Sequence, residues 1–273
     1  CSLLFLSLIL IFKFFVFNFS DNGISFHSVL AIPISVVTML FPNISDFKFP
    51  DWVFKTTFLF FNSDGGESGA CGNGTRCVAD LISKEINNKD IVLRTLSGIL
   101  KSEILGNNIV TTEIGVAKTD WNEIPLSEKL NTKNLNIKIN DKNDKEYSGG
   151  TAVNVGNPHV IFFVNEINNF DIKKLGPNIE NNKYFPEKCN VTIAQVINKD
   201  LIKVKVWERG AGLTKACGTA ACATAFAGKL NNLCNDKTDI EFENGKLSIS
   251  IDKKNSIHMK GPVSDIKEIE INL

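Results

Sequence analysis

The chain has no excess of charge of either sign, since 30 Lys and Arg balance 30 Asp and Glu over 273 residues. A neutral chain lacks the basic field that draws a protein to phosphate backbones, which argues against a nucleic-acid partner. Cysteine is also sparse. Seven cysteines, an odd number, argue against a secreted, disulfide-stapled protein of this length. The sequence therefore predicts a reducing, cytoplasmic location with free thiols. Hydrophobic residues, at 43%, are still enough to fill the cores of one large or two ordinary domains.

Residues 1–57 differ in composition from the rest of the chain. Residues 1–61 hold 14 of the 20 Phe, whereas residues 1–57 hold only 6 of the 60 charged side chains. We therefore expect residues 1–57 to be an atypical segment that does not belong to the native protein, as after a frame error. A signal peptide or membrane anchor is the alternative, because residues 1–19 are mostly apolar and about 20 such residues span a bilayer. Against it, no Lys or Arg precedes this run and Lys13 interrupts it.

Beyond residue 57 the sequence is typical of a sheet-rich α/β (α+β) protein. Apolar and β-branched runs are separated by Gly and Asn, as in successive strands. The predicted strands cover residues 91–95, 99–105, 109–115, 151–155, 160–164, 191–197, 201–207, 240–242, 246–251 and 256–260. Helices are predicted where Val78, Leu81, Ile82 and Ile86 recur at helical spacing, and over the Ala-rich residues 222–230.

Two short segments of the chain resemble each other: residues 70–77 (ACGNGTRC) and residues 216–222 (ACGTAAC). Each contains Ala-Cys-Gly, then a second Cys five or six residues after the first, at the start of a small-residue helix. A repeated motif predicts two similar halves. Zinc is a weak alternative, because structural zinc sites need tighter Cys spacing and a matching partner set. We expect Cys77 and Cys222 to be core residues of the two helices.

Cys71 and Cys217 occupy a different position, just before a glycine-containing turn that opens a helix. Unpaired backbone N–H groups and the positive end of the helix dipole collect there, which lowers a thiol pKa from about 8.5. The same donors hold a substrate carboxylate and the charge that grows on it during deprotonation. If the two thiols face each other across a cleft, one thiolate takes a proton from a carbon and the opposite thiol returns one. The pattern therefore predicts inversion of a stereocentre without a metal or an organic cofactor.

Five motifs, in family order, resemble those of the diaminopimelate epimerase family, cofactor-independent enzymes of lysine and peptidoglycan precursor synthesis. They are residues 61–65 (FNSDG) leading to 70–77, residues 156–159 (GNPH), residues 190–191 (NV), residues 207–219 (WERGAGLTKACGT) and residues 259–263 (MKGPV). The resemblance implies two pseudo-symmetric domains, each a β-rich, barrel-like sheet around a central helix, with the active site between them.

The resemblance also implies domain boundaries. We expect residues 58–116 and 263–273 to form a first, incomplete domain and residues 117–262 to form the second. The family's glycine-rich N-terminal loop with an Asn-Asp-Phe sequence has no match in residues 1–57. The sequence leaves the oligomeric state open, with a homodimer as one alternative.

The resemblance assigns roles residue by residue. Cys71 and Cys217 are implied as the acid/base pair, with His159 and Glu208 tuning their thiols. The implied substrate-binding residues are Asn62, Gly72, Asn73, Asn157, Asn190, Glu208, Arg209, Gly218 and Thr219. From chemistry alone, Arg209 is a planar fork suited to a carboxylate, and Asn amides both donate and accept hydrogen bonds. The implied reaction interconverts LL- and meso-diaminopimelate, with no cofactor and no metal.

Other functions stay open at this point. A proline racemase or hydroxyproline epimerase shares the fold and the cysteine chemistry, although residues 208–212 favour diaminopimelate. An isomerase of the phenazine-synthesis type lacks the cysteine pair. From another class, an inactive or membrane-tethered homologue is the alternative that the aberrant residues 1–57 raise.

Overall fold

The structure is a computed structural model that describes residues 15–17, 29–33, 58–61, 67–68, 72–95 and 98–263, the first four ranges as backbone only. Two of the predicted site residues, Asn62 and Cys71, lie outside the described residues. So does the atypical segment 1–57, apart from two short strands within it.

The described part of the chain contains three α-helices and one 3-10 helix. The helices are α1 (Gly72–Ile86), η3 (Ile167–Asn169), α2 (Ile172–Glu180) and α3 (Gly218–Leu230). The strands are β1 (Phe15–Phe17), β2 (Val29–Pro33), β3 (Phe58–Phe61), β4 (Glu67–Ser68), β5 (Asp90–Thr95), β6 (Gly98–Gly106), β7 (Ile109–Val116), β8 (Ile137–Asn140), β9 (Glu146–Gly149), β10 (Thr151–Asn154), β11 (Pro158–Val164), β12 (Asn190–Asn198), β13 (Leu201–Glu208), β14 (Gly212–Thr214), β15 (Lys237–Phe242), β16 (Gly245–Ile251) and β17 (Ser256–Pro262).

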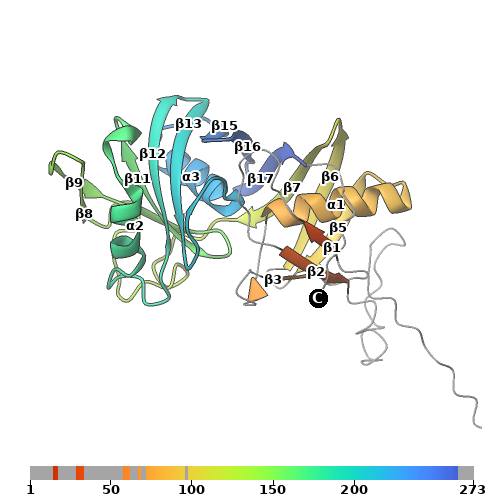
Figure 1. The fold of residues 1–273 in the computed structure, drawn as a ribbon, viewed down its shortest axis with the longest axis horizontal. Helices are drawn as coiled ribbons and strands as arrows, with labels where there is room; N and C mark the ends of the chain where they lie inside the picture. Colours follow the sequence, from red (N-terminus) through yellow and green to blue (C-terminus); the bar gives the residue numbers. More distant parts are fainter. Residues whose placement is uncertain are drawn as a thin grey trace, which may run out of the picture.

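One long sheet runs through both halves of the molecule (Figure 1). Its strand order is β10-β11-β12-β13-β15-β16-β17-β7-β6-β5, and β14 pairs with β13. The two halves join where β17 pairs antiparallel with β7, with Met259 opposite Thr112. Strands β1 to β4 form a separate sheet, and β8 and β9 form a hairpin.

Helix α3 is the core of one half, and the strands from β10 to β17 curve around it. It is buried from Gly218 to Gly228, and five of these eleven residues are Ala, whose small side chains let the surrounding strands approach closely. Cys222 and Phe226 pack among the inward side chains of the strands, such as Ile161 and Val206. The prediction that Cys222 is a core residue is confirmed.

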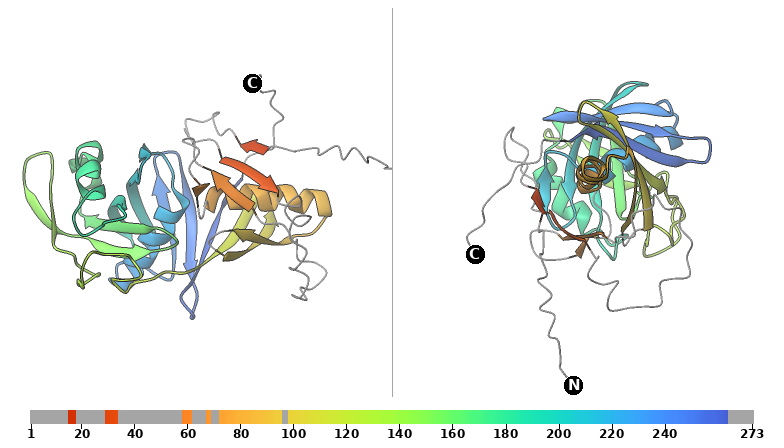
Figure 2. Two further views of the ribbon diagram at one scale, coloured as in Figure 1. Left: turned by 90° about the horizontal axis from the view of Figure 1, so that it is seen from below. Right: turned by 90° about the vertical axis from the view of Figure 1, so that its right-hand side faces the viewer.

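Helix α1 is the core helix of the other half and packs against β5, β6 and β7. Figure 2 looks along this helix in its right-hand view. Cys77, Val78 and Ile82 face the sheet and pack against Leu93 and Val110. Cys77 is therefore a core residue, as predicted, and the fold has a helix wrapped by strands in each half.

The outer face of the β10–β13 strands is covered by η3, α2 and the β8–β9 hairpin, which enclose a third apolar cluster. The sequence prediction found every strand from β5 to β17 except β8, β9 and β14, and found α1 and α3 but missed α2. Among the described residues, no helix has the length and apolar character needed to cross a bilayer.

Candidate active site

The first residues of the two core helices lie against each other. A Cβ atom on Gly218, the first residue of α3, would lie 3.5 Å from the Cα of Gly72, the first residue of α1. The side chain of Met259, fully buried on β17, lies against both glycines. Because each helix start carries unpaired N–H groups and the positive end of a dipole, this junction is suited to hold an anion.

Cys217 is the N-cap residue of α3. Its sulfur accepts a hydrogen bond from the N–H of Ala220 at 3.4 Å and lies 3.4 Å from the hydroxyl of Thr219. Burial raises the pKa of the Cys217 thiol well above its usual value, and the negative charge of Glu208 raises it further. These two effects outweigh the helix start, so the prediction of a lowered thiol pKa at Cys217 is wrong. Cys217 carries its proton at neutral pH.

Three polar side chains lie in a row at the ends of adjacent strands, on the face of the sheet that α3 covers. His159 on β11 lies opposite Asn190 on β12, and Glu208 on β13 lies next in the row. Their chain neighbours Val160 and Val191 pack on the outer face of the sheet, and successive side chains of a strand point to opposite faces. Glu208 accepts a hydrogen bond from the Thr214 hydroxyl at 2.6 Å.

His159 is a neutral imidazole in this row. Burial lowers its pKa from 6.5 to about 3, and the positive charge of Arg209 acts in the same direction. Nε2 lies 2.8 Å from the Asn157 Oδ1, an acceptor, so in the neutral ring Nε2 carries the proton. Among the described residues, Nδ1 is then a buried acceptor with no hydrogen-bond partner. His159 therefore brings no positive charge to the site.

The buried His159 predicts a loss of stability in mild acid. Its pKa is about 3 in the folded protein and about 6.5 in an unfolded chain, so below pH 6.5 the unfolded state binds the extra proton. We expect this residue alone to lower the free energy of unfolding by about 2 kcal/mol between pH 7 and pH 5. Urea unfolding of the wild type and of His159→Gln at both pH values measures it. Equal losses in the two proteins would contradict the prediction.

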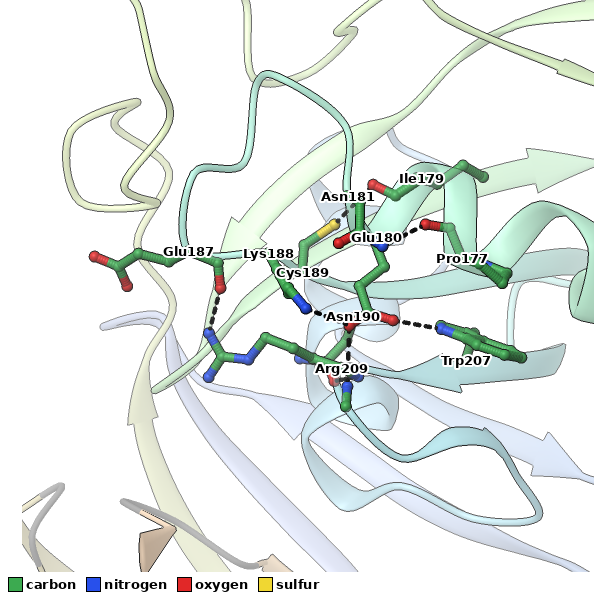
Figure 3. A network of polar contacts seen from close by, with 11 residues as sticks. Pro177, Ile179, Glu180, Asn181, Glu187, Lys188, Cys189, Asn190, Trp207 and Arg209 are labelled. Atoms are coloured by element: carbon green, nitrogen blue, oxygen red, sulfur yellow. Dashed lines mark hydrogen bonds and ion pairs between the residues drawn. The ribbon is translucent and has the colours of Figure 1, made fainter. Parts of the chain in front are cut away.

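The end of β13 is tied to the start of β12. The backbone N–H of Arg209 donates to the Asn190 Oδ1 at 3.0 Å, and the Asn190 Nδ2 donates to the carbonyl of Pro158 at 3.0 Å. The guanidinium of Arg209 is exposed and donates to the carbonyl of Glu187 at 2.9 Å (Figure 3). Asn190 therefore links two strand ends, and Arg209 is accessible to a ligand at the rim of the row.

The model of the diaminopimelate epimerase family matches residues 37–119 and 151–266. The chain belongs to this family. The diaminopimelate epimerase of Pelagibacter ubique is 68% identical over 214 residues, which cover 78% of each chain. The diaminopimelate epimerase of Acidiphilium cryptum is 37% identical over 77% of this chain and 74% of its own. The family match reaches residue 37, inside the segment of atypical composition.

Solved structures of other epimerases and racemases share the fold. A probable proline racemase from Agrobacterium radiobacter has a TM-score of 0.57 at 11% identity, over 83% of this chain and 75% of its own. A hydroxyproline epimerase from Agrobacterium vitis has a TM-score of 0.51 at 11% identity, over 76% of this chain and 67% of its own. At these identities the likeness extends to the fold alone. The sequence match thus separates this chain from the proline racemase alternative.

The structure places most of the residues implied by the family resemblance in two groups. Gly72, Asn73, Cys217, Gly218 and Thr219 lie at the junction of the helix starts. The second group, Asn157, His159, Asn190, Glu208 and Arg209, lies at the strand ends around β11, β12 and β13. The charge and a side-chain hydrogen bond of Glu208 act on the Cys217 thiol, which joins the two groups.

Two further residues lie at the helix junction, Arg76 and Met259. Arg76 is buried and donates to the Asn73 Oδ1 at 2.9 Å and to the sulfur of Met259 at 3.2 Å. Arg76 thus binds the first turn of α1 to β17, while the thioether of Met259 fills the space between the two glycines. Arg76 follows Gly72 by four residues, one helical turn, but a buried guanidinium has no signature in a single sequence.

Proposed function

We propose that this chain interconverts LL- and meso-diaminopimelate by inverting one α-carbon, with Cys71 and Cys217 as the two acid/base groups. The observation that carries the proposal is the contact between Gly72 and Gly218, since each glycine directly follows one of the cysteines in the sequence. In a family of epimerases, two thiols at converging helix starts give one acid/base group for each face of a bound carbon.

The proposed inversion needs two proton transfers and no other reagent. A thiolate takes the α-proton, which converts it to a thiol and leaves an electron pair on the carbon. The opposite thiol then gives its proton to the other face and becomes the thiolate. Cys217, buried beside Glu208, carries a proton at neutral pH. The scheme therefore requires Cys71 as the thiolate that acts as base.

The helix junction stabilises the intermediate in this scheme. When the α-carbon loses its proton, negative charge spreads onto the substrate carboxylate. The first N–H groups of α1 and α3 donate to a carboxylate held there, and both dipoles favour its charge. Arg209 at the rim then binds a carboxylate of the substrate with two parallel hydrogen bonds.

We also propose the domain boundaries implied by the family resemblance, after residues 116 and 262. The hydrophobic clusters support them, because Val110 and Val263 pack with α1, whereas Ala117 and Met259 pack with α3.

A cytoplasmic location fits the proposed thiol chemistry, since thiol catalysis needs reduced cysteines. The cysteines in the described part of the chain, Cys77, Cys189, Cys217, Cys222 and Cys234, are all free of disulfides.

Turnover in heavy water tests the proposed function. With LL-diaminopimelate as substrate, we expect the meso product to carry deuterium at the inverted carbon from the first turnover. The remaining substrate should keep its original hydrogen at early times, because the base on that side returns the same proton. Proline and hydroxyproline serve as control substrates and should not exchange. Failure of diaminopimelate to exchange or invert would overturn the proposal.

A further inference from the structure

A buried carboxyl group lies beside Trp207, near the end of β13 (Figure 3). Glu180, the last residue of α2, is 6% exposed. Its Oε2 accepts a hydrogen bond from the indole N–H of Trp207 at 2.7 Å, and its Oε1 accepts one from the backbone N–H of Gly210 at 3.1 Å. One side chain therefore contacts the residues on both sides of Glu208 and Arg209.

The indole of Trp207 is also confined by two glycines. A Cβ atom on Gly176 of α2 would lie 2.4 Å from the Cγ and Cδ2 of the ring. A Cβ atom on Gly212 of β14 would lie 3.5 Å from its Cη2. The ring packs closely against α2 and reaches β14, so its hydrogen bond to Glu180 ties α2 directly to the end of β13.

The turn from β13 to β14 contains two glycines and is held in place partly by a hydrogen bond from outside the turn. Gly210 and Gly212 have positive φ angles of 75° and 84°, which glycine adopts readily, but fixing a glycine in one conformation costs more backbone entropy than fixing any other residue. Within the turn, the N–H of Ala211 donates to the carbonyl of Glu208 at 3.1 Å. Glu180 adds a hydrogen bond from a separate helix, and Lys188 lies 4.0 Å from its Oε1.

We propose that Glu180 is a positioning residue of the reaction, which holds the β13–β14 turn so that Glu208 stays beside Cys217 and Arg209 stays at the rim of the site. This inference rests on the proposed function. Glu180 acts through Trp207 and Gly210, since its carboxyl oxygens are both engaged with these two donors.

The Glu180→Gln variant tests this role. A glutamine has one acceptor oxygen, so its NH₂ group must face either the Trp207 N–H or the Gly210 N–H, where donor meets donor. Hydrogen bonds to charged groups are among the stronger ones, and we expect kcat/KM for diaminopimelate to fall by about 10-fold to 100-fold. The larger part of the change is expected in KM, because Arg209 binds substrate.

Asp171→Asn is the matched control. Asp171 caps the other end of α2, where its exposed carboxylate accepts from the N–H of Lys173 at 3.1 Å. Asparagine caps a helix as well as aspartate does, so this variant removes the same charge from the same helix without touching Trp207. We expect its kcat and KM to stay within about twofold of the wild type, since surface changes of this kind have small effects.

Fluorescence of Trp207 distinguishes positioning from general stability. The difference in emission between each protein and its Trp207→Phe version isolates this indole, and we expect a shift in Glu180→Gln but not in Asp171→Asn. Wild-type kinetics in Glu180→Gln, or lost activity with unchanged Trp207 emission, would overturn the inference. If the wild type does not act on diaminopimelate, the proposed function fails, and the emission of Trp207 still decides whether Glu180 holds the turn.

Discussion

Replacing Cys217 with alanine is expected to lower the rate of inversion by about 10²-fold to 10⁴-fold, the range that acid/base groups contribute. Cys217 caps α3 directly before Gly218, which contacts the start of α1, and it carries a proton at neutral pH. Without this thiol the carbon cannot be reprotonated from its second face. Steady-state rates of conversion of LL- to meso-diaminopimelate, measured at saturating substrate, give the size of the loss.

Cys222→Ala provides the control for this variant. Cys222 lies five residues later in the same helix and is fully buried in the core, where burial raises its pKa to about 12. The substitution removes a buried sulfur from the interior of the same helix and leaves its N-cap residue in place. We expect it to keep the wild-type kcat per folded molecule. If Cys217→Ala kept the same activity as Cys222→Ala, the two-thiol scheme would be refuted.

Gly176→Ala is expected to destabilise the protein and to impair catalysis together. In an ordinary helix this change stabilises by about 0.5–1 kcal/mol, because alanine is the better helix former. Here the new Cβ would lie 2.4 Å from two atoms of the Trp207 ring. Overpacking of this kind costs about 1–3 kcal/mol. Displacement of the ring also moves Glu208 and Arg209, which follow it in the chain. Because small shifts of groups at an active site cost large factors in rate, we expect kcat/KM to fall by more than about tenfold.

Urea unfolding and steady-state kinetics measure both effects of Gly176→Ala. Asn178→Ala serves as the control, because Asn178 lies two residues later in α2 on its exposed face. Its free energy of unfolding should change by less than about 0.5 kcal/mol. A Gly176→Ala protein as stable and as active as Asn178→Ala would show that the packing of Trp207 against α2 is not needed.

The strands of the long sheet were predictable because one or both of their faces pack against apolar clusters. Such packing leaves runs of apolar and β-branched residues in the sequence. Residues 191–197 and 201–207 read as strands in the sequence, and the structure confirms both within β12 and β13. Strands β8, β9 and β14 have only three or four residues each. None of the three has two adjacent apolar residues, whereas the equally short β10 contains Ala152 and Val153 and was predicted.

Helix α2 was missed because its composition opposes a helix. Gly176 and Pro177 stand in its middle, and both are unfavourable in helix interiors. Packing overrides this preference, since Ile172, Leu175 and Ile179 all contact the cluster on the outer face of the sheet. Because the helix was missed, nothing in the sequence pointed to the carboxyl group of Glu180 at its end.

The chemical residues of the site were predictable, but their protonation was not. The Cys-Gly pairs and the family motifs identified Cys217, His159 and Glu208 from the sequence. The pKa of Cys217 depends on how deeply the junction is buried and on the distance to Glu208. Both are products of the tertiary fold, and a motif of a few residues contains neither of them.

The two-thiol mechanism requires that the thiols of Cys71 and Cys217 can reach each other. In a Cys222→Ala background, trypsin gives one peptide of residues 56–76 with Cys71 as its sole cysteine and one of residues 216–229 with Cys217 as its sole cysteine. Mild oxidation of the folded protein followed by mass spectrometry should show these two peptides joined, since a disulfide requires Cα atoms about 4.4–6.8 Å apart. Bound substrate should slow their joining. If Cys71 pairs with a different cysteine, or both thiols stay free under oxidation, the two cysteines do not share one site and the two-thiol mechanism is refuted.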